Sequence, residues 1–226
     1  MTADRENLIE DLIADLKPVH RPGRIRRPLI AWLVIAIAYG AVIVVTTGPL
    51  RDGAVHNLVA SPPFALETLL AMLAIVSLAH ATLRTAIPGE ASPAKLLLWP
   101  LLFVGAWVAI YIAGVWHPAH PVSMLGKRDH CVWQTVLFSL PSLGLLLWMA
   151  RGLLPLWPRT TAMLAGAASA AIPGALMQFA CMYAPGHILT HHIGPIFITA
   201  AIGGIAGRLL LTRRATVPRS RGVSVH

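Results

Sequence analysis

Six long apolar runs constrain this chain more than any other feature of its sequence. They cover approximately residues 28–46, 64–83, 96–116, 131–150, 160–182 and 191–211. A transmembrane α-helix needs about 20 predominantly apolar residues to cross the hydrocarbon core of a bilayer. Backbone polar groups in lipid must be satisfied within the segment, and runs this long without strand alternation indicate helices. The sequence therefore predicts an all-α integral membrane protein with six transmembrane helices.

Composition supports this class of protein. Hydrophobic residues make up 56% of the 226 residues and charged residues only 12%, whereas a soluble domain has roughly 25% charged residues. The runs fill most of residues 28–211, which we take as the transmembrane domain, and leave no room for a separate soluble domain. The first run follows a polar leader of 27 residues and is longer than the apolar core of a signal peptide. We therefore expect an anchor rather than a cleaved signal.

The distribution of lysine and arginine between the runs predicts the orientation of the helices. Six of these residues lie in residues 1–27, five lie from position 208 onward, and the second and fourth connections carry two each. The remaining connections contain only Arg51, Lys127 and Arg128. Because basic residues favour the cytoplasmic side, we expect both termini in the cytoplasm and the protein in the inner membrane. The net charge of +9 then reflects topology, so the expected partner is the lipid bilayer and not nucleic acid.

The leader carries an amphipathic pattern over residues 4–17. Its apolar stripe consists of Leu8, Ile9, Leu12, Ile13 and Leu16, and its opposite face is acidic, with Glu6, Glu10, Asp11 and Asp15. An acidic face suits anionic lipids poorly, and an isolated helix of this length is marginal in water. We interpret residues 1–27 as a cytoplasmic docking segment for a protein partner, against the alternative of a solvated leader. Residues 212–226 are expected to form a basic cytoplasmic tail.

Small residues and tryptophans predict how the spans pack. The fifth and sixth runs contain small residues at four-residue spacing, which lets helices approach closely; these are Gly166, Ala170 and Gly174, then Gly203 and Gly207. The pattern leaves open whether the close contact is within one chain or in a homo-oligomer. Tryptophans near the ends of the runs are expected to form aromatic belts, with Trp32, Trp99 and Trp157 at inner ends and Trp116 and Trp133 at outer ends.

The predicted topology gathers thiols and imidazoles on the outer side of the membrane. Cys131 opens the fourth run and Cys181 lies near the end of the fifth. Candidate accessory ligands on that side are His117, His120, His130, His187, His191 and His192. Thiolate and imidazole bind zinc, cadmium, copper(I) and related metals. In the absence of a tight motif, we expect no obligatory cofactor but a transient heavy-metal ion at the periplasmic face.

Glu67 is the acid that lies within an apolar run, about one turn below the outer surface by position. An ionisable group inside a membrane predicts a functional role, and Glu67 is therefore a further candidate ligand. At this shallow depth, a side chain that snorkels to the surface is the competing interpretation.

Three interpretations compete for the two cysteines: a structural disulfide, inert buried thiols, or a reactive pair that senses metal or oxidant. We favour the reactive pair, because the neighbouring histidines favour thiolate and metal binding. An enzyme is not expected. A thiol oxidase ordinarily carries two cysteine pairs, and a transporter would carry ionisable groups at the bilayer midplane.

Several segments resemble one known family. They are LIEDLIADLKPVHR in the leader, a cysteine that opens the fourth span with Pro141 and Arg151 downstream, Cys181 followed by a histidine-containing turn, and the closing GGIAGRLLL. These are similar to the NrsF (negative regulator of sigma F) family, six-span inner-membrane anti-sigma factors that hold an extracytoplasmic-function (ECF) sigma factor inactive. This chain has His191-His192 where the family often has an aromatic residue before the histidine.

The resemblance implies that the leader binds the sigma factor and that Cys131 and Cys181 perceive a signal, in a family associated with metal and oxidative stress. The alternatives from the residues alone are another redox- or metal-responsive membrane regulator, or a small membrane enzyme or transporter.

Overall fold

The computed structural model describes residues 5–7, 9, 10, 13, 25–89, 92–118 and 120–211. Its helices are α2 (Arg26–Thr46), α3 (Ala54–Ala60), α4 (Pro62–Thr85), α5 (Pro93–Trp116), α6 (Cys131–Arg151), α7 (Pro158–Ala180), α8 (Pro185–His187), the π-helix η1 (Ile188–Ile193) and α9 (Gly194–Leu210). Six segments are long and apolar enough to span a membrane, and α8, η1 and α9 together form the sixth. The described residues contain no named strand. The predicted all-α, six-span membrane protein is confirmed.

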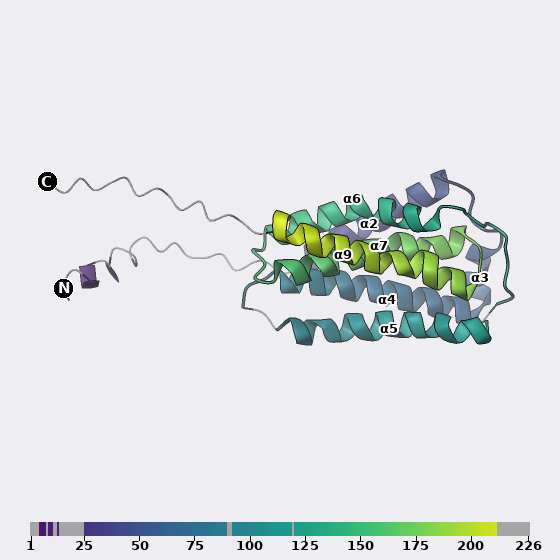
Figure 1. Ribbon diagram of the computed structural model, residues 1–226, viewed down its shortest axis with the longest axis horizontal. Helices are drawn as coiled ribbons and strands as arrows, with labels where there is room; N and C mark the ends of the chain where they lie inside the picture. Colours follow the sequence, from purple (N-terminus) through teal and green to yellow (C-terminus); the bar gives the residue numbers. More distant parts are fainter. Residues whose placement is uncertain are drawn as a thin grey trace.

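The helices form one elongated bundle, in which α2 begins and α9 ends at the same end (Figure 1). We call this the terminal end. The opposite end carries α3, the first residue of α6 and the connection from α7 to α8, and we call it the cysteine end (Figure 1). That the terminal end faces the cytoplasm stays a prediction.

Proline sets several helix starts. The first turns of α4, α5, α7, α8 and α9 each carry one at the first or second position. Proline is well suited there, because its missing N–H has no partner within the helix and its fixed φ is already helical.

The fifth span, α7, is the central helix of the bundle. It packs against α2, α4, α6 and α9, whereas α5 packs chiefly along α4 and also contacts α8 and η1 of the sixth span. In the most apolar window of each helix, 78% of the residues are buried in α7 and 17% in α5. α7 therefore faces the other helices of the bundle, and α5 leaves most of its surface uncovered by them.

Small residues bring α7 and α9 into close contact, as the sequence predicts. A Cβ atom at Gly166 would collide with the carbonyl group of Thr199, and one at Gly207 would lie 2.6 Å from the carbonyl oxygen of Pro158. Side chains larger than hydrogen would push the helices apart, so the glycines permit backbone-to-backbone packing within one chain.

The last two spans differ from their predicted boundaries. α7 ends at Ala180 because Cys181 is extended, with φ −109° and ψ 174°. The sixth span begins at Pro185 rather than at residue 191, because Pro185 starts a helical turn that continues through η1. His187 consequently lies on a helix and not in the loop before it, and His191 and His192 lie in η1 rather than at the start of the span.

The predicted aromatic belt is wrong for Trp32. Its side chain is fully buried, and Nε1 donates a hydrogen bond of 2.9 Å to the carbonyl oxygen of Ser142. Trp99, Trp116, Trp133 and Trp157 are each more than half exposed, as expected.

Most of the docking segment lies outside the described residues, including Leu8, Asp11, Leu12, Asp15 and Leu16. The described Ile9, Glu10 and Ile13 are helical and exposed. The tail, residues 212–226, is also outside the described part of the chain.

Candidate functional site

The two cysteines meet at the cysteine end of the bundle. The Sγ atoms of Cys131 and Cys181 are 3.2 Å apart although the residues are fifty positions apart in sequence. Both side chains are fully buried and both thiols are free. The prediction from topology alone, that the two residues share one level of the membrane, is consistent with this pairing.

The loop before α6 fixes the position of Cys131. The guanidinium group of Arg128 donates hydrogen bonds to Thr47 Oγ1 and to the carbonyl oxygen of Pro49, at 3.0 and 3.2 Å. It thereby satisfies acceptors where α2 ends. The carbonyl oxygen of Arg128 accepts a 3.3 Å hydrogen bond from the Cys131 thiol. Arg128, one of the three basic residues in the predicted outer connections, therefore anchors the site to α2.

The chain after α7 holds Cys181 in place by its backbone. The N–H of Ser123 donates to the carbonyl oxygen of Tyr183 at 3.0 Å, and the N–H of Arg51 donates to that of Phe179 at 2.8 Å. One loop thus holds the last turn of α7 and a second loop holds the extended connection after it, so Cys181 is fixed from both sides.

Two histidines of the sixth span join the cysteines. His187 Nε2 lies 3.4 Å from Cys181 Sγ, and one ligand atom from each of Cys131, Cys181, His187 and His192 lies within 4.8 Å of all the others. We call these four residues the thiol–imidazole cluster. Thiols and imidazoles at these distances can bind one metal ion, and the two thiols can also be oxidised to a disulfide.

The π-helix η1 explains why His187 and His192 share one face. In a π-helix the hydrogen bond runs between residues five apart, so positions 187 and 192 stack along the same side. Their ring centroids are 5.1 Å apart. In a regular α-helix, residues three and four apart would be neighbours instead.

The other predicted ligands lie outside the cluster. His191 stacks on His187 with centroids 4.2 Å apart, but its Nδ1 is 2.7 Å from Thr190 Oγ1. His117 and His130 are exposed, and His120 Nε2 pairs with Ser61 Oγ at 2.6 Å. The structure therefore brings together two of the six predicted histidines and separates four from the thiols.

Glu67 belongs to a second polar centre. Its side chain is 1% exposed, and its carboxylate accepts hydrogen bonds from Tyr183 at 2.7 Å and from Tyr111 at 3.0 Å. The guanidinium carbon of Arg51 lies 5.5 Å from the centroid of the Tyr183 ring. We call Glu67, Tyr111, Tyr183 and Arg51 the carboxylate–phenol network. Glu67 is buried and bound by tyrosines, so it does not snorkel to the surface.

The sequence reasoning missed the partners of Glu67. Two of the three tyrosines in the chain bind this one carboxylate, and Arg51 is one of few basic residues in its predicted outer region. Tyrosine and arginine are rare in and beside the outer ends of the apolar runs, and this rarity was the one sequence signal that pointed to them as partners. No local pattern pairs Glu67 with Tyr183, because the residues are 116 positions apart.

The environment of Cys181 favours its thiolate. The hydrogen-bond contact between the two sulfur atoms lowers the pKa of Cys181 below its usual range, burial acts in the opposite direction, and His192 adds to the lowering. A lowered pKa makes a cysteine a better metal ligand and a better nucleophile at neutral pH.

The pKa values of two nearby residues outside the spans, Tyr183 and His120, are shifted for other reasons. Burial raises the pKa of Tyr183, and the hydrogen bond to Glu67 raises it further. Burial lowers the pKa of His120, and the charge of Arg51 lowers it too.

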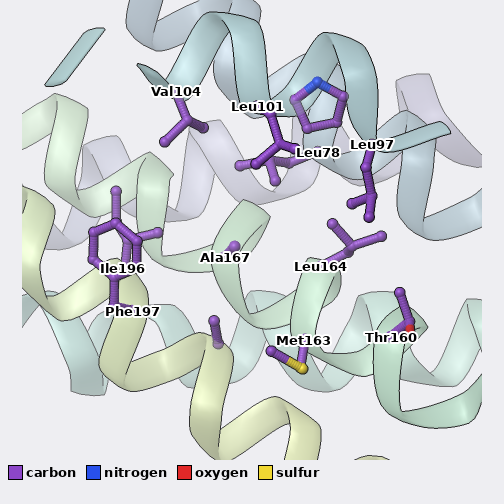
Figure 2. A pocket seen from close by; sticks show the side chains of 12 residues that line it. Leu78, Leu97, Leu101, Val104, Thr160, Met163, Leu164, Ala167, Ile196 and Phe197 are labelled. Carbon is purple, nitrogen blue, oxygen red and sulfur yellow. The ribbon is translucent and has the colours of Figure 1, made fainter. Parts of the chain in front are cut away.

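An apolar cavity of about 420 Å³ lies in the other half of the bundle (Figure 2). It separates α5 from α7 and α9, with Leu101 and Val104 on one side and Leu164 and Phe197 on the other (Figure 2). Thr160 is its one polar lining residue. The cavity lies between α5 and the central helix, and its lining residues include no group able to do the chemistry of the cysteine end.

Comparison with known proteins identifies the family. Residues 12–212 match the family model described as NrsF, negative regulator of sigma F. No curated protein and no solved structure matches the chain. The match covers most of the chain, from the leader to the end of the sixth span. The chain therefore belongs to the NrsF family, whose description makes it a negative regulator of sigma F, here built as a multi-pass membrane protein.

Proposed function

We propose that this protein is an inner-membrane anti-sigma factor that binds an ECF sigma factor through its cytoplasmic N-terminal segment. A metal or oxidative signal at the periplasmic face, sensed through Cys131 and Cys181, releases the sigma factor. The family description supports the class of partner. The excess of basic residues at both ends of the sequence supports the orientation.

The docking half of the proposal rests on the leader. Five apolar residues form one stripe of residues 4–17, and four acids lie opposite. A helix of this kind is marginal alone and gains its stability from a partner that covers the stripe. Docking would bury the stripe and leave the acids for basic side chains of the sigma factor.

The sensing half rests on one observation: two free, fully buried thiols lie 3.2 Å apart at the end of the bundle opposite the start of α2 (Figure 1). The cluster takes residues from α6, from the end of α7 and from the sixth span. Metal binding or disulfide formation at the thiols would therefore tie separate helices together.

Close helix packing offers the route from this site to the leader. α7 packs along α9, whose last turn lies at the terminal end, and packed interfaces tend to switch between discrete arrangements. Moving such an equilibrium from 1:99 to 99:1 needs about 5.5 kcal/mol of differential binding. Thiolate–metal bonding is large enough, since structural zinc sites in peptides bind with about 10–16 kcal/mol.

Substitutions in the leader test docking. In the full-length protein, Leu12→Asp places a charge in the apolar stripe and should weaken sigma-factor capture by at least about tenfold, because burying an unpaired charge costs several kcal/mol. Ala14→Asp adds the same charge on the acidic face and is the matched control. Equal capture by both variants would contradict the docking surface.

Cysteine substitutions test sensing. Sigma-dependent transcription should respond to metal or oxidant in wild-type cells and lose that response in Cys131→Ser and Cys181→Ser strains, at unchanged membrane levels of the protein. Met182→Leu changes a buried neighbour of the thiols and should preserve the response. An ordinary response in both serine strains would remove the cysteines from the signal.

A further inference from the structure

We infer that the thiol–imidazole cluster is a complete four-coordinate site for a d¹⁰ divalent cation of the zinc class, with His187 and His192 as ligands beside Cys131 and Cys181. The role of this site in signalling rests on the proposed function, but the site itself does not.

The distances fit tetrahedral coordination. Metal–sulfur and metal–nitrogen bonds of about 2.3 and 2.0 Å place neighbouring ligand atoms about 3.3–3.8 Å apart around a tetrahedral zinc ion. Cys181 Sγ is 3.4 Å from His187 Nε2 and 3.2 Å from Cys131 Sγ. All four ligand atoms lie within 4.8 Å of one another, so small side-chain adjustments are enough to complete the site.

His192 supplies an independent reason to expect a ligand. Its ring is fully buried, and one of its nitrogen atoms lies within 4.8 Å of the ligand atoms of Cys131, Cys181 and His187. Yet neither ring nitrogen has a hydrogen-bond partner of ordinary geometry among the described residues. A buried polar atom without a partner is unfavourable. A disulfide between the cysteines would leave this imidazole without a partner, whereas a metal ion would use it.

Charge and softness define the class of cation. Two thiolates and two neutral imidazoles balance a divalent ion, so the buried site carries no net charge when loaded. Burial strongly disfavours an uncompensated charge. Sulfur and nitrogen donors select zinc-like and soft metals over magnesium or calcium, which take oxygen ligands. On binding, each thiol loses its proton to solvent and forms a bond to the metal.

The backbone places both histidines for this task. η1 spans Ile188–Ile193 and aligns residues five apart. His191 is not one of the four cluster residues, and its Nδ1 pairs with Thr190 Oγ1. His191 is therefore a matched control: the same residue type, one position from His192 and stacked on His187.

The test is Co²⁺ titration of the reduced, metal-free, full-length protein in detergent, followed by displacement with Zn²⁺. Wild type should bind one Co²⁺ with thiolate-to-cobalt charge transfer and the intense visible bands of a tetrahedral ion, and Zn²⁺ should abolish both. His187→Ala and His192→Ala should weaken binding by at least 100-fold, since loss of partners outside the first coordination sphere alone costs roughly 10–100-fold. His191→Ala should bind as wild type does.

A second variant distinguishes the loss of a metal ligand from a failure to fold. His187→Cys replaces one ligand by another and should retain tetrahedral Co²⁺ with stronger charge transfer. Failure of reduced wild type to bind Co²⁺, or wild-type binding by both alanine variants, would overturn the site. Loss of Co²⁺ binding in His192→Ala with an unchanged sigma response would leave the site standing and refute its sensory role. The converse, wild-type Co²⁺ binding by the alanine variants with cysteine-dependent signalling, would refute the histidine ligands alone.

Discussion

The thiol–imidazole cluster and the carboxylate–phenol network are neighbouring sites, because the short connection after α7 contributes a residue to each. Cys181 enters the first and Tyr183 the second. In the network, each carboxylate oxygen of Glu67 accepts one hydrogen bond from a tyrosine. In the cluster, neither ring nitrogen of the buried His192 has a hydrogen-bond partner of ordinary geometry among the described residues.

This difference separates a structural centre from a responsive one. A satisfied buried network stabilises a single arrangement and gains little from a further ligand. A cluster whose ligand atoms are not fully paired can still bind a metal ion, and it therefore gains stability when the ion is added. The two centres should therefore respond differently to substitution. Substitutions in the network should lower the stability of the protein, and substitutions in the cluster should lower its response to metal.

The largest loss of stability is expected for Glu67→Ala. It removes the acceptor of two buried tyrosine hydroxyls, and each hydrogen bond to a charged group contributes roughly 1.5–3 kcal/mol. We expect a destabilisation of about 3 kcal/mol or more, measured by thermal unfolding in detergent. Leu66→Ala, at the exposed neighbouring position, is the control. A Glu67→Ala variant as stable as the control would contradict a structural role for the network.

A smaller loss is expected for Tyr183→Phe. The ring remains between Arg51 and Phe64, so only the 2.7 Å hydrogen bond to Glu67 disappears. The expected destabilisation is about 1.5–3 kcal/mol in the same assay. Tyr39→Phe alters the one tyrosine outside the network and should have little effect. An effect as large for Tyr39→Phe would mean that the assay does not report on this network.

The smallest effect on stability is expected in the cluster. In the reduced, metal-free protein, Cys131→Ser removes neither a disulfide nor a metal bond, so unfolding should shift by less than about 1.5 kcal/mol. Added Zn²⁺ should stabilise wild type and leave the serine variant unchanged, because a ligand that binds only the folded state raises its stability. A large loss in Cys131→Ser that appears only in the oxidised, metal-free protein would instead favour a structural disulfide.

The two centres also differ in how far the sequence predicts them. The six spans follow from run length alone, and the common level of Cys131 and Cys181 follows from the order of the spans. His191 and His192 are adjacent and chemically identical, and only the π-helix decides which one faces the thiols. Local sequence patterns do not encode that choice reliably.

Contacts between distant spans account for the remaining differences. Glu67 is a lone acid in an apolar run, and both the functional and the snorkelling interpretations fit that pattern. Its burial depends on tyrosines 44 and 116 positions away. Trp32 likewise looks like an interfacial residue by position, but its indole N–H reaches a carbonyl oxygen 110 residues away. Such partners become visible only once the helices are packed.

The most direct test of the central claim is release of the sigma factor from the full-length protein. The complex, with its cysteines reduced, would be placed in lipid nanodiscs, and the fraction of sigma factor still bound would be measured before and after addition of Zn²⁺ or an oxidant. We predict release from wild type and retention by the Cys131→Ser and Cys181→Ser variants. Equal release from the serine variants, or full retention by wild type under both treatments, would contradict signalling through the two thiols.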